Sequence, residues 1–189
     1  FEPMSRGANI EMLPVIRFDL ILEIRPPRGG EIELENARRV LYACRKAGMN
    51  LKWVSLDTYQ SKDSLQILAK QGFIVGTQSM DTDTVAYDVS KQALYDGRVL
   101  APESAKAKLE WARLERDPKT KKIDHPPKGS KDVSDSMAGV IYGLTMRREI
   151  WSRHGISLRS IPPTLLDREQ GGKTTIRYME VLRQERYGR

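Results

Sequence analysis

Three aspartates stand where carboxylate chemistry could take place. Asp57 directly follows the short apolar run Leu51–Leu56, whereas Asp132 and Asp135 lie three residues apart at the start of a helical pattern. Residues three apart on a helix share a face, so this pair would hold two carboxylates side by side. Like charges so placed repel unless a cation lies between them. Carboxylate oxygens are the ligands that Mg²⁺ and Mn²⁺ prefer, so these aspartates are candidate metal ligands.

Each aspartate also has an ordinary structural explanation. An aspartate after a strand often caps the next turn, and an aspartate in the first turn of a helix is stabilised by the helix dipole. A metal site would favour phosphodiester hydrolysis, in which two ions about 4 Å apart activate water and stabilise the leaving oxygen. Such a site needs carboxylates from separate elements, and Asp57 and Asp135 come from two such elements.

Positive charge gathers in one loop of the chain. Lysine and arginine outnumber aspartate and glutamate by 32 to 25, a formal charge of +7, and five lysines cluster in the loop Asp117–Lys131. A solvated surface would explain this loop equally well. A polyanionic partner would instead place lysines along phosphates without reading bases. The candidate DNA-binding residues are Lys121, Lys122, Lys128 and Lys131.

Alternating strands and helices must position these residues. The pattern predicts strands over 15–25, 51–56 and 73–77, and helices over 31–47, 61–71, 83–95, 104–116 and 132–151. This order predicts an α/β fold in which parallel strands carry helices on both faces of the sheet. Ligands bind such sheets at the carboxyl ends of the strands, which is where Asp57 is expected.

Composition and sequence pattern also constrain the domain organisation, the membrane-spanning potential and the disulfide content of the chain. We expect one domain over residues 1–154 and a short basic appendage over 155–189, where Pro162-Pro163 and Gly171-Gly172 interrupt the pattern. No apolar stretch reaches the roughly 20 residues that a membrane span requires. The single cysteine, Cys44, excludes an internal disulfide and is expected to be a small core residue.

Several spaced segments resemble the nuclease domain of the large terminase subunit of tailed bacteriophages. The first is Ser55–Ser64, around Asp57, and the last is Lys122–Gly139, which contains both later aspartates. Between them, Ser79–Asp81, the helix around Tyr87 and Asp96–Arg98 are similar to the corresponding stretch of that family. The resemblance spans about Pro14 to Leu144, and its specificity comes from the spaced set rather than from any one segment.

This resemblance implies an RNase H-like mixed sheet and a metal-dependent endonuclease that cuts concatemeric viral DNA. By the same resemblance, Asp57 matches a metal ligand on the central strand, Asp135 matches the helix ligand, and Asp132 occupies the neighbouring position. It further implies Mg²⁺ or Mn²⁺ as cofactor and the cytoplasm of the host cell as location. The implied partners are double-stranded DNA, the portal protein, the small terminase subunit and an upstream ATPase domain.

One departure from the family keeps other functions open. The family's first metal-binding aspartate lies on an earlier strand, and no counterpart precedes Val15; Asp19 is not assigned to that role. One alternative is therefore another RNase H-like nuclease, of the resolvase or transposase type. The other is a catalytically silent module that binds DNA or docks on the portal.

Overall fold

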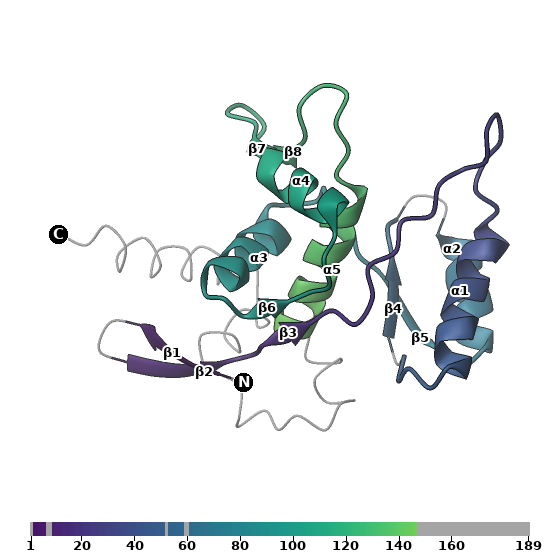
Figure 1. The fold of residues 1–189 in the computed structure, drawn as a ribbon, viewed down its shortest axis with the longest axis horizontal. Coiled ribbons are helices and arrows are strands. Elements are labelled where there is room, and N and C mark those ends of the chain that lie inside the picture. The colour runs from purple at the N-terminus through teal and green to yellow at the C-terminus, as the bar shows by residue number, and fades with distance from the viewer. Residues whose placement is uncertain (1, 7–8, 52, 59–60, 147–189) are drawn as a thin grey trace. The chain divides into compact units, whose positions relative to one another are not determined.

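The computed structural model describes residues 2–6, 9–51, 53–58 and 61–146, and Figure 1 shows their fold. The chain forms two compact units. Unit 1 comprises the described residues of Phe1–Leu20 and Asp83–Arg189, and unit 2 comprises those of Ile21–Thr82. Each unit has its own strands and helices, so each is considered by itself below.

Unit 2 is built around two parallel strands. Strand β4 (Trp53–Leu56) pairs with β5 (Ile74–Thr77), with Val54 opposite Val75. Helices α1 (Leu34–Lys46) and α2 (Lys62–Lys70) lie on the same side of this pair (Figure 1). Val54, Leu68 and Phe73 form the buried centre between strands and helices. The predicted strand–helix–strand order with parallel pairing is confirmed here.

Unit 1 is dominated by helices α3 (Val85–Tyr95), α4 (Ala105–Arg113) and α5 (Asp132–Met146). Helix α5 contacts both α3 and α4. The buried positions of α3 and α5 include residues with small side chains, which let helix backbones approach closely; these are Ala86, Ser90, Ala93, Ser134 and Ala138. The close approach brings the start of α5 against α3.

The strand predicted over 15–25 is wrong after Arg17. Only β3 (Ile16–Arg17) is formed, in parallel with β6 (Val99–Leu100), and the last hydrogen bond runs from Phe18 N to Leu100 O at 2.7 Å. Pro102 follows β6 and has no N–H to donate, so the partner edge ends there. Strands β1 (Glu2–Arg6) and β2 (Asn9–Leu13) form a separate antiparallel pair.

The helix predicted over 104–116 ends early. Leu114 is extended, and β7 (Glu115–Arg116) pairs in antiparallel fashion with β8 (Ile123–Asp124). We call Glu115–Asp124 the basic hairpin, because its turn carries Lys119, Lys121 and Lys122. The sequence predicted a loop here, so the strand pair is an additional element.

The fold is mixed α/β, as predicted. The described strands form four two-stranded sheets, however, rather than the one sheet with helices on both faces that the sequence predicted. The final helix is confirmed over Asp132–Met146, whereas the expected appendage at 155–189 lies outside the described residues. Within the described part of the chain, no helix is long and apolar enough to cross a membrane.

Candidate functional site

Asp57 lies where the sequence predicted it, immediately after β4. Its side chain is exposed, and Oδ1 accepts a hydrogen bond from the backbone N–H of Thr58 at 2.5 Å. The strand before it continues to pair with its neighbour, since Gln78 N donates to Leu56 O at 2.9 Å. Asp57 is therefore presented at the carboxyl end of a parallel pair in unit 2, and it also stabilises the turn that follows.

Asp135 lies in the first turn of α5, where the described side chains of Tyr87 and Lys131 donate to it. The hydroxyl of Tyr87, on α3, donates to Oδ1. Lys131 Nζ lies 3.3 Å from Oδ1 and 3.2 Å from Oδ2, one helical turn earlier. The ammonium group balances the charge of this carboxylate within unit 1. About a quarter of the Asp135 side chain, 28%, remains exposed, so a hydrated cation or a phosphate can reach it.

Asp132 begins the same helix and is exposed. It stands one turn before Asp135, in the position that the sequence predicted. Among the described residues, no group of three or more aspartate, glutamate, histidine or cysteine side chains is placed to hold a metal ion. The structure therefore brings Asp132, Asp135 and Lys131 together in unit 1, while Asp57 belongs to unit 2.

Glu110, which the sequence did not single out, anchors the start of α5. Its carboxylate is 4% exposed and accepts hydrogen bonds from Ser130 Oγ at 2.5 Å and from Ser134 N at 2.8 Å. Lys106 Nζ lies 3.3 Å away. Burial alone raises the pKa of Glu110, but the hydrogen bonds from Ser130, Ser134 and Lys106 outweigh it, and the net pKa is lowered.

The basic hairpin is closed by Asp117. Its Oδ1 accepts from the backbone N–H groups of Lys119 and Thr120, each at 2.7 Å. These bonds, that of Thr120 first, lower the pKa of Asp117. Lys121 adopts the left-handed conformation, with φ of 61°, which few residues other than glycine and asparagine adopt readily. Lys121 and Lys122 are exposed, as a phosphate-binding role requires.

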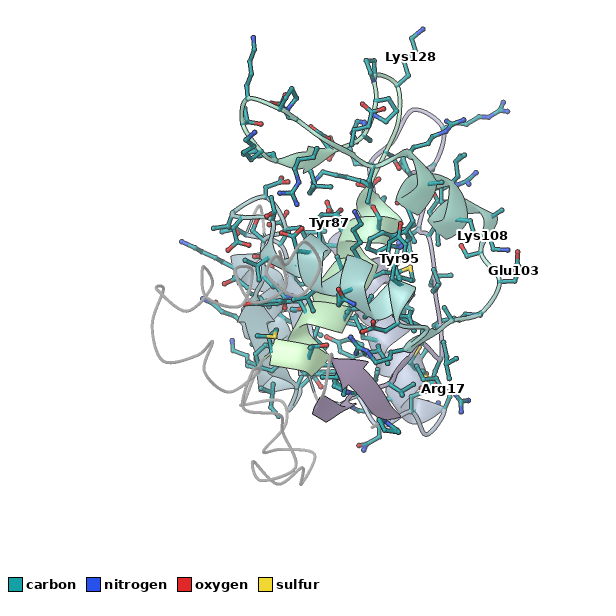
Figure 2. All side chains as sticks on the ribbon, turned by 90° about the vertical axis from the view of Figure 1, so that its left-hand side faces the viewer. Arg17, Tyr87, Tyr95, Glu103, Lys108 and Lys128 are labelled. Carbon is teal, nitrogen blue, oxygen red and sulfur yellow. The ribbon has the colours of Figure 1, made fainter. Side chains whose placement is uncertain are left out.

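Two further contacts order the chain between the basic hairpin and helix α5. Arg116 donates to Asp88 Oδ1 at 2.5 Å, which ties the hairpin to α3. Beyond the hairpin, Gly129 N donates to Pro126 O at 2.9 Å and closes the turn that leads into α5. Lys128 is exposed on this turn, also left-handed with φ of 65°. Figure 2 shows Lys128 projecting from the surface. The side chain of Lys131, by contrast, is only 13% exposed and lies against Asp135.

The residues that sequence reasoning missed form hydrogen bonds with residues far away in the sequence. Glu110 reaches Ser134 over 24 positions, and Tyr87 reaches Asp135 over 48. No local spacing could reveal such contacts; only the resemblance pointed to the segment around Tyr87. A comparison with protein-family models, curated proteins and solved structures finds no match for this chain.

Proposed function

We propose that this chain is a metal-dependent DNA endonuclease of a viral genome-packaging motor, with an RNase H-like fold. The observation that supports it best is the start of α5. There an accessible carboxylate, Asp135, and a lysine, Lys131, directly follow a segment of exposed lysines. Acidic oxygens for a cation and ammonium groups for phosphates are the two components that metal-assisted cleavage of DNA needs.

The donor set suits a hard divalent cation. Asp57 and Asp132 are exposed and Asp135 is partly exposed, so water-coordinated Mg²⁺ or Mn²⁺ can approach their oxygens. A bound cation of this kind supplies activation of water and neutralises charge at the leaving oxygen. Asp57 in unit 2 and Asp135 in unit 1 are the proposed principal ligands, each within its own unit, with Asp132 assisting beside Asp135. Lys131 would exchange its contact with Asp135 for one with the scissile phosphate.

The exposed lysines define the proposed DNA contact. Lys121, Lys122 and Lys128 lie on the hairpin and on the turn that follows it, in the same unit as Asp135. Since lysines bind phosphates as point charges, they would hold duplex DNA without reading its sequence. The proposed setting is the host cytoplasm, with the portal protein, the small terminase subunit and an ATPase domain as partners.

A second candidate function is a DNA-binding or portal-docking module without catalysis. The pairing of Asp135 with Tyr87 and Lys131 favours it, because the charge of this carboxylate is already balanced. In that case the basic hairpin would still bind DNA. Asp57 would stabilise the turn after β4, and Asp132 and Asp135 would stabilise the first turn of α5.

Cleavage of supercoiled plasmid separates these functions. The wild type is incubated with Mn²⁺, Mg²⁺ or EDTA beside Asp57→Asn, Asp135→Asn and a control, Asp63→Asn, which removes one exposed carboxylate of α2. We expect metal-dependent nicking that both site variants lose, by about a hundredfold or more, and that the control retains. Cleavage in EDTA, or full activity of both variants, would refute the proposal.

Two other outcomes identify the alternatives. DNA binding without cleavage by the wild type would support the silent module. Strong preference for a branched junction over linear duplex would support a nuclease of the resolvase type. The substrates are therefore compared in the same metal and salt.

A further inference from the structure

Tyr87 is a buried residue whose hydroxyl faces the candidate metal ligand. The residue is only 4% exposed, on the face of α3 that contacts α5. A buried tyrosine hydroxyl almost always has a hydrogen-bond partner. Here it donates to Asp135 Oδ1, and Ser134 Oγ lies 3.4 Å from it.

The ring of Tyr87 is fixed by packing. It meets the indole of Trp111, on α4, in an edge-to-face arrangement, with ring centroids 5.7 Å apart and an interplanar angle of 67°. Edge-to-face contacts of this kind are favourable aromatic geometries. Because helices α3 and α4 both hold the ring, the direction of the hydroxyl is determined by the fold rather than by a flexible chain.

The second donor to Asp135 is of a different kind. Lys131 contacts the carboxylate from the same helix, through a long stem with many rotamers. Such a group can leave when a phosphate or a cation arrives. The rigid phenol of Tyr87 stays in place when Lys131 moves away. Its hydrogen bond therefore remains as a fixed constraint on the orientation of the Asp135 carboxylate.

Another buried hydroxyl of α3 bonds differently. Ser90, on the same helix, donates to the backbone carbonyl of Ala86 at 2.7 Å, which is a local contact within α3. Tyr87 instead directs its hydroxyl across the helix interface to a side chain that is partly exposed. We propose that Tyr87 is a positioning residue, which orients the carboxylate of Asp135 to bind a divalent cation. This inference rests on the proposed role of Asp135.

The test compares Tyr87→Phe with Tyr95→Phe. Phenylalanine keeps the ring against Trp111 and removes only the hydroxyl, and Tyr95, 75% exposed on the same helix, is the matched control (Figure 2). Mn²⁺ binding to the full chain is measured by electron paramagnetic resonance of the free ion. We expect Tyr87→Phe to raise the dissociation constant about tenfold and Tyr95→Phe to leave it unchanged.

Repeating the pair in the Asp135→Asn background distinguishes positioning from a general structural role. If Tyr87 acts through Asp135, removing its hydroxyl has no further effect on Mn²⁺ binding there. A further loss in that background, or a Tyr87→Phe variant that binds Mn²⁺ as the wild type does, overturns the inference. Thermal unfolding in EDTA shows whether each variant folds.

The same data separate this inference from the proposed function. Loss of Mn²⁺ binding in Asp135→Asn with no effect of Tyr87→Phe rejects the positioning role and retains the metal site. A wild type that binds Mn²⁺ no better than Asp135→Asn rejects both.

Discussion

Oε2 of Glu110 accepts a hydrogen bond from the backbone N–H of Ser134 at 2.8 Å, so a side chain of α4 satisfies a donor in the first turn of α5. The first N–H groups of a helix have no partner within it. Oε1 of the same carboxylate accepts from Ser130 Oγ at 2.5 Å. One buried charge thus holds both the helix start and the end of the segment that precedes it, and thereby the backbone that carries Lys131 and Asp135.

Replacing Glu110 with glutamine should destabilise the protein in a pH-dependent way. The neutral amide loses charge-assisted hydrogen bonds, so we expect the free energy of unfolding at neutral pH to fall by about 2 kcal/mol. Because the pKa of Glu110 is lowered in the folded chain from its ordinary value of 4.5, ionised Glu110 stabilises the fold above that value. This contribution is lost as the pH falls through the lowered pKa.

Urea unfolding followed by far-UV circular dichroism measures this effect across the acid range. The difference between wild type and Glu110→Gln should be constant above about pH 5 and should vanish at lower pH. Glu103→Gln is the control, because Glu103 is exposed and pairs only at the surface with Lys108 (Figure 2). A difference that persists at the lowest pH would show that the charge of Glu110 is not what stabilises the contact.

The positions of the first two helices followed from the sequence, because a glycine marks the end of each. Gly48 and Gly72 have positive φ values of 94° and 77° and terminate the first two helices. The basic hairpin could not be predicted in this way, since its turn places a lysine, Lys121, in the left-handed conformation. The prediction of a strand over 15–25 was wrong because a strand needs a paired neighbour in the fold. The short strand β6 provides one only as far as Leu100.

The candidate site was predictable only in part. Asp57, Asp132 and Asp135 could be identified because they stand next to strand and helix boundaries that the pattern defines. Tyr87 and Glu110 depend on how α3, α4 and α5 pack, which is set by small side chains such as Ala138, 0% exposed, rather than by sequence spacing. Their roles therefore emerge only from the three-dimensional contacts.

Removing two of the exposed lysines proposed to bind DNA should weaken DNA binding and reduce its salt dependence. Asparagine suits Lys121 and Lys128, since both have left-handed backbones that asparagine tolerates. For the double variant Lys121→Asn/Lys128→Asn we expect several-fold weaker binding and a salt slope smaller by about 2, one unit per lost phosphate contact. Fluorescence anisotropy with labelled duplex in EDTA, over a range of salt concentrations, gives both quantities.

A charge-matched control tests whether position matters. Lys70→Gln/Lys108→Gln removes the same charge from exposed helical sites on α2 and α4. It should change the slope by much less. If both double variants weaken binding equally, net charge rather than the positions of Lys121 and Lys128 would explain DNA affinity.

The packing of Trp53 over Gly76 leads to a prediction for unit 2. A Cβ added at Gly76 would lie 2.7 Å from Cζ2 and 2.9 Å from Cη2 of the Trp53 indole. The indole must therefore move if residue 76 carries a side chain. We expect Gly76→Ala to lower the free energy of unfolding by about 1–3 kcal/mol, measured by urea unfolding.

Two comparisons test this cause. Thr77→Ala, at the next and exposed position of β5, should have a small effect. In a Trp53→Leu background the clash is absent, so adding Gly76→Ala should cost much less than it does in the wild type. An equal cost in both backgrounds would mean that the backbone of Gly76, rather than the indole above it, requires glycine.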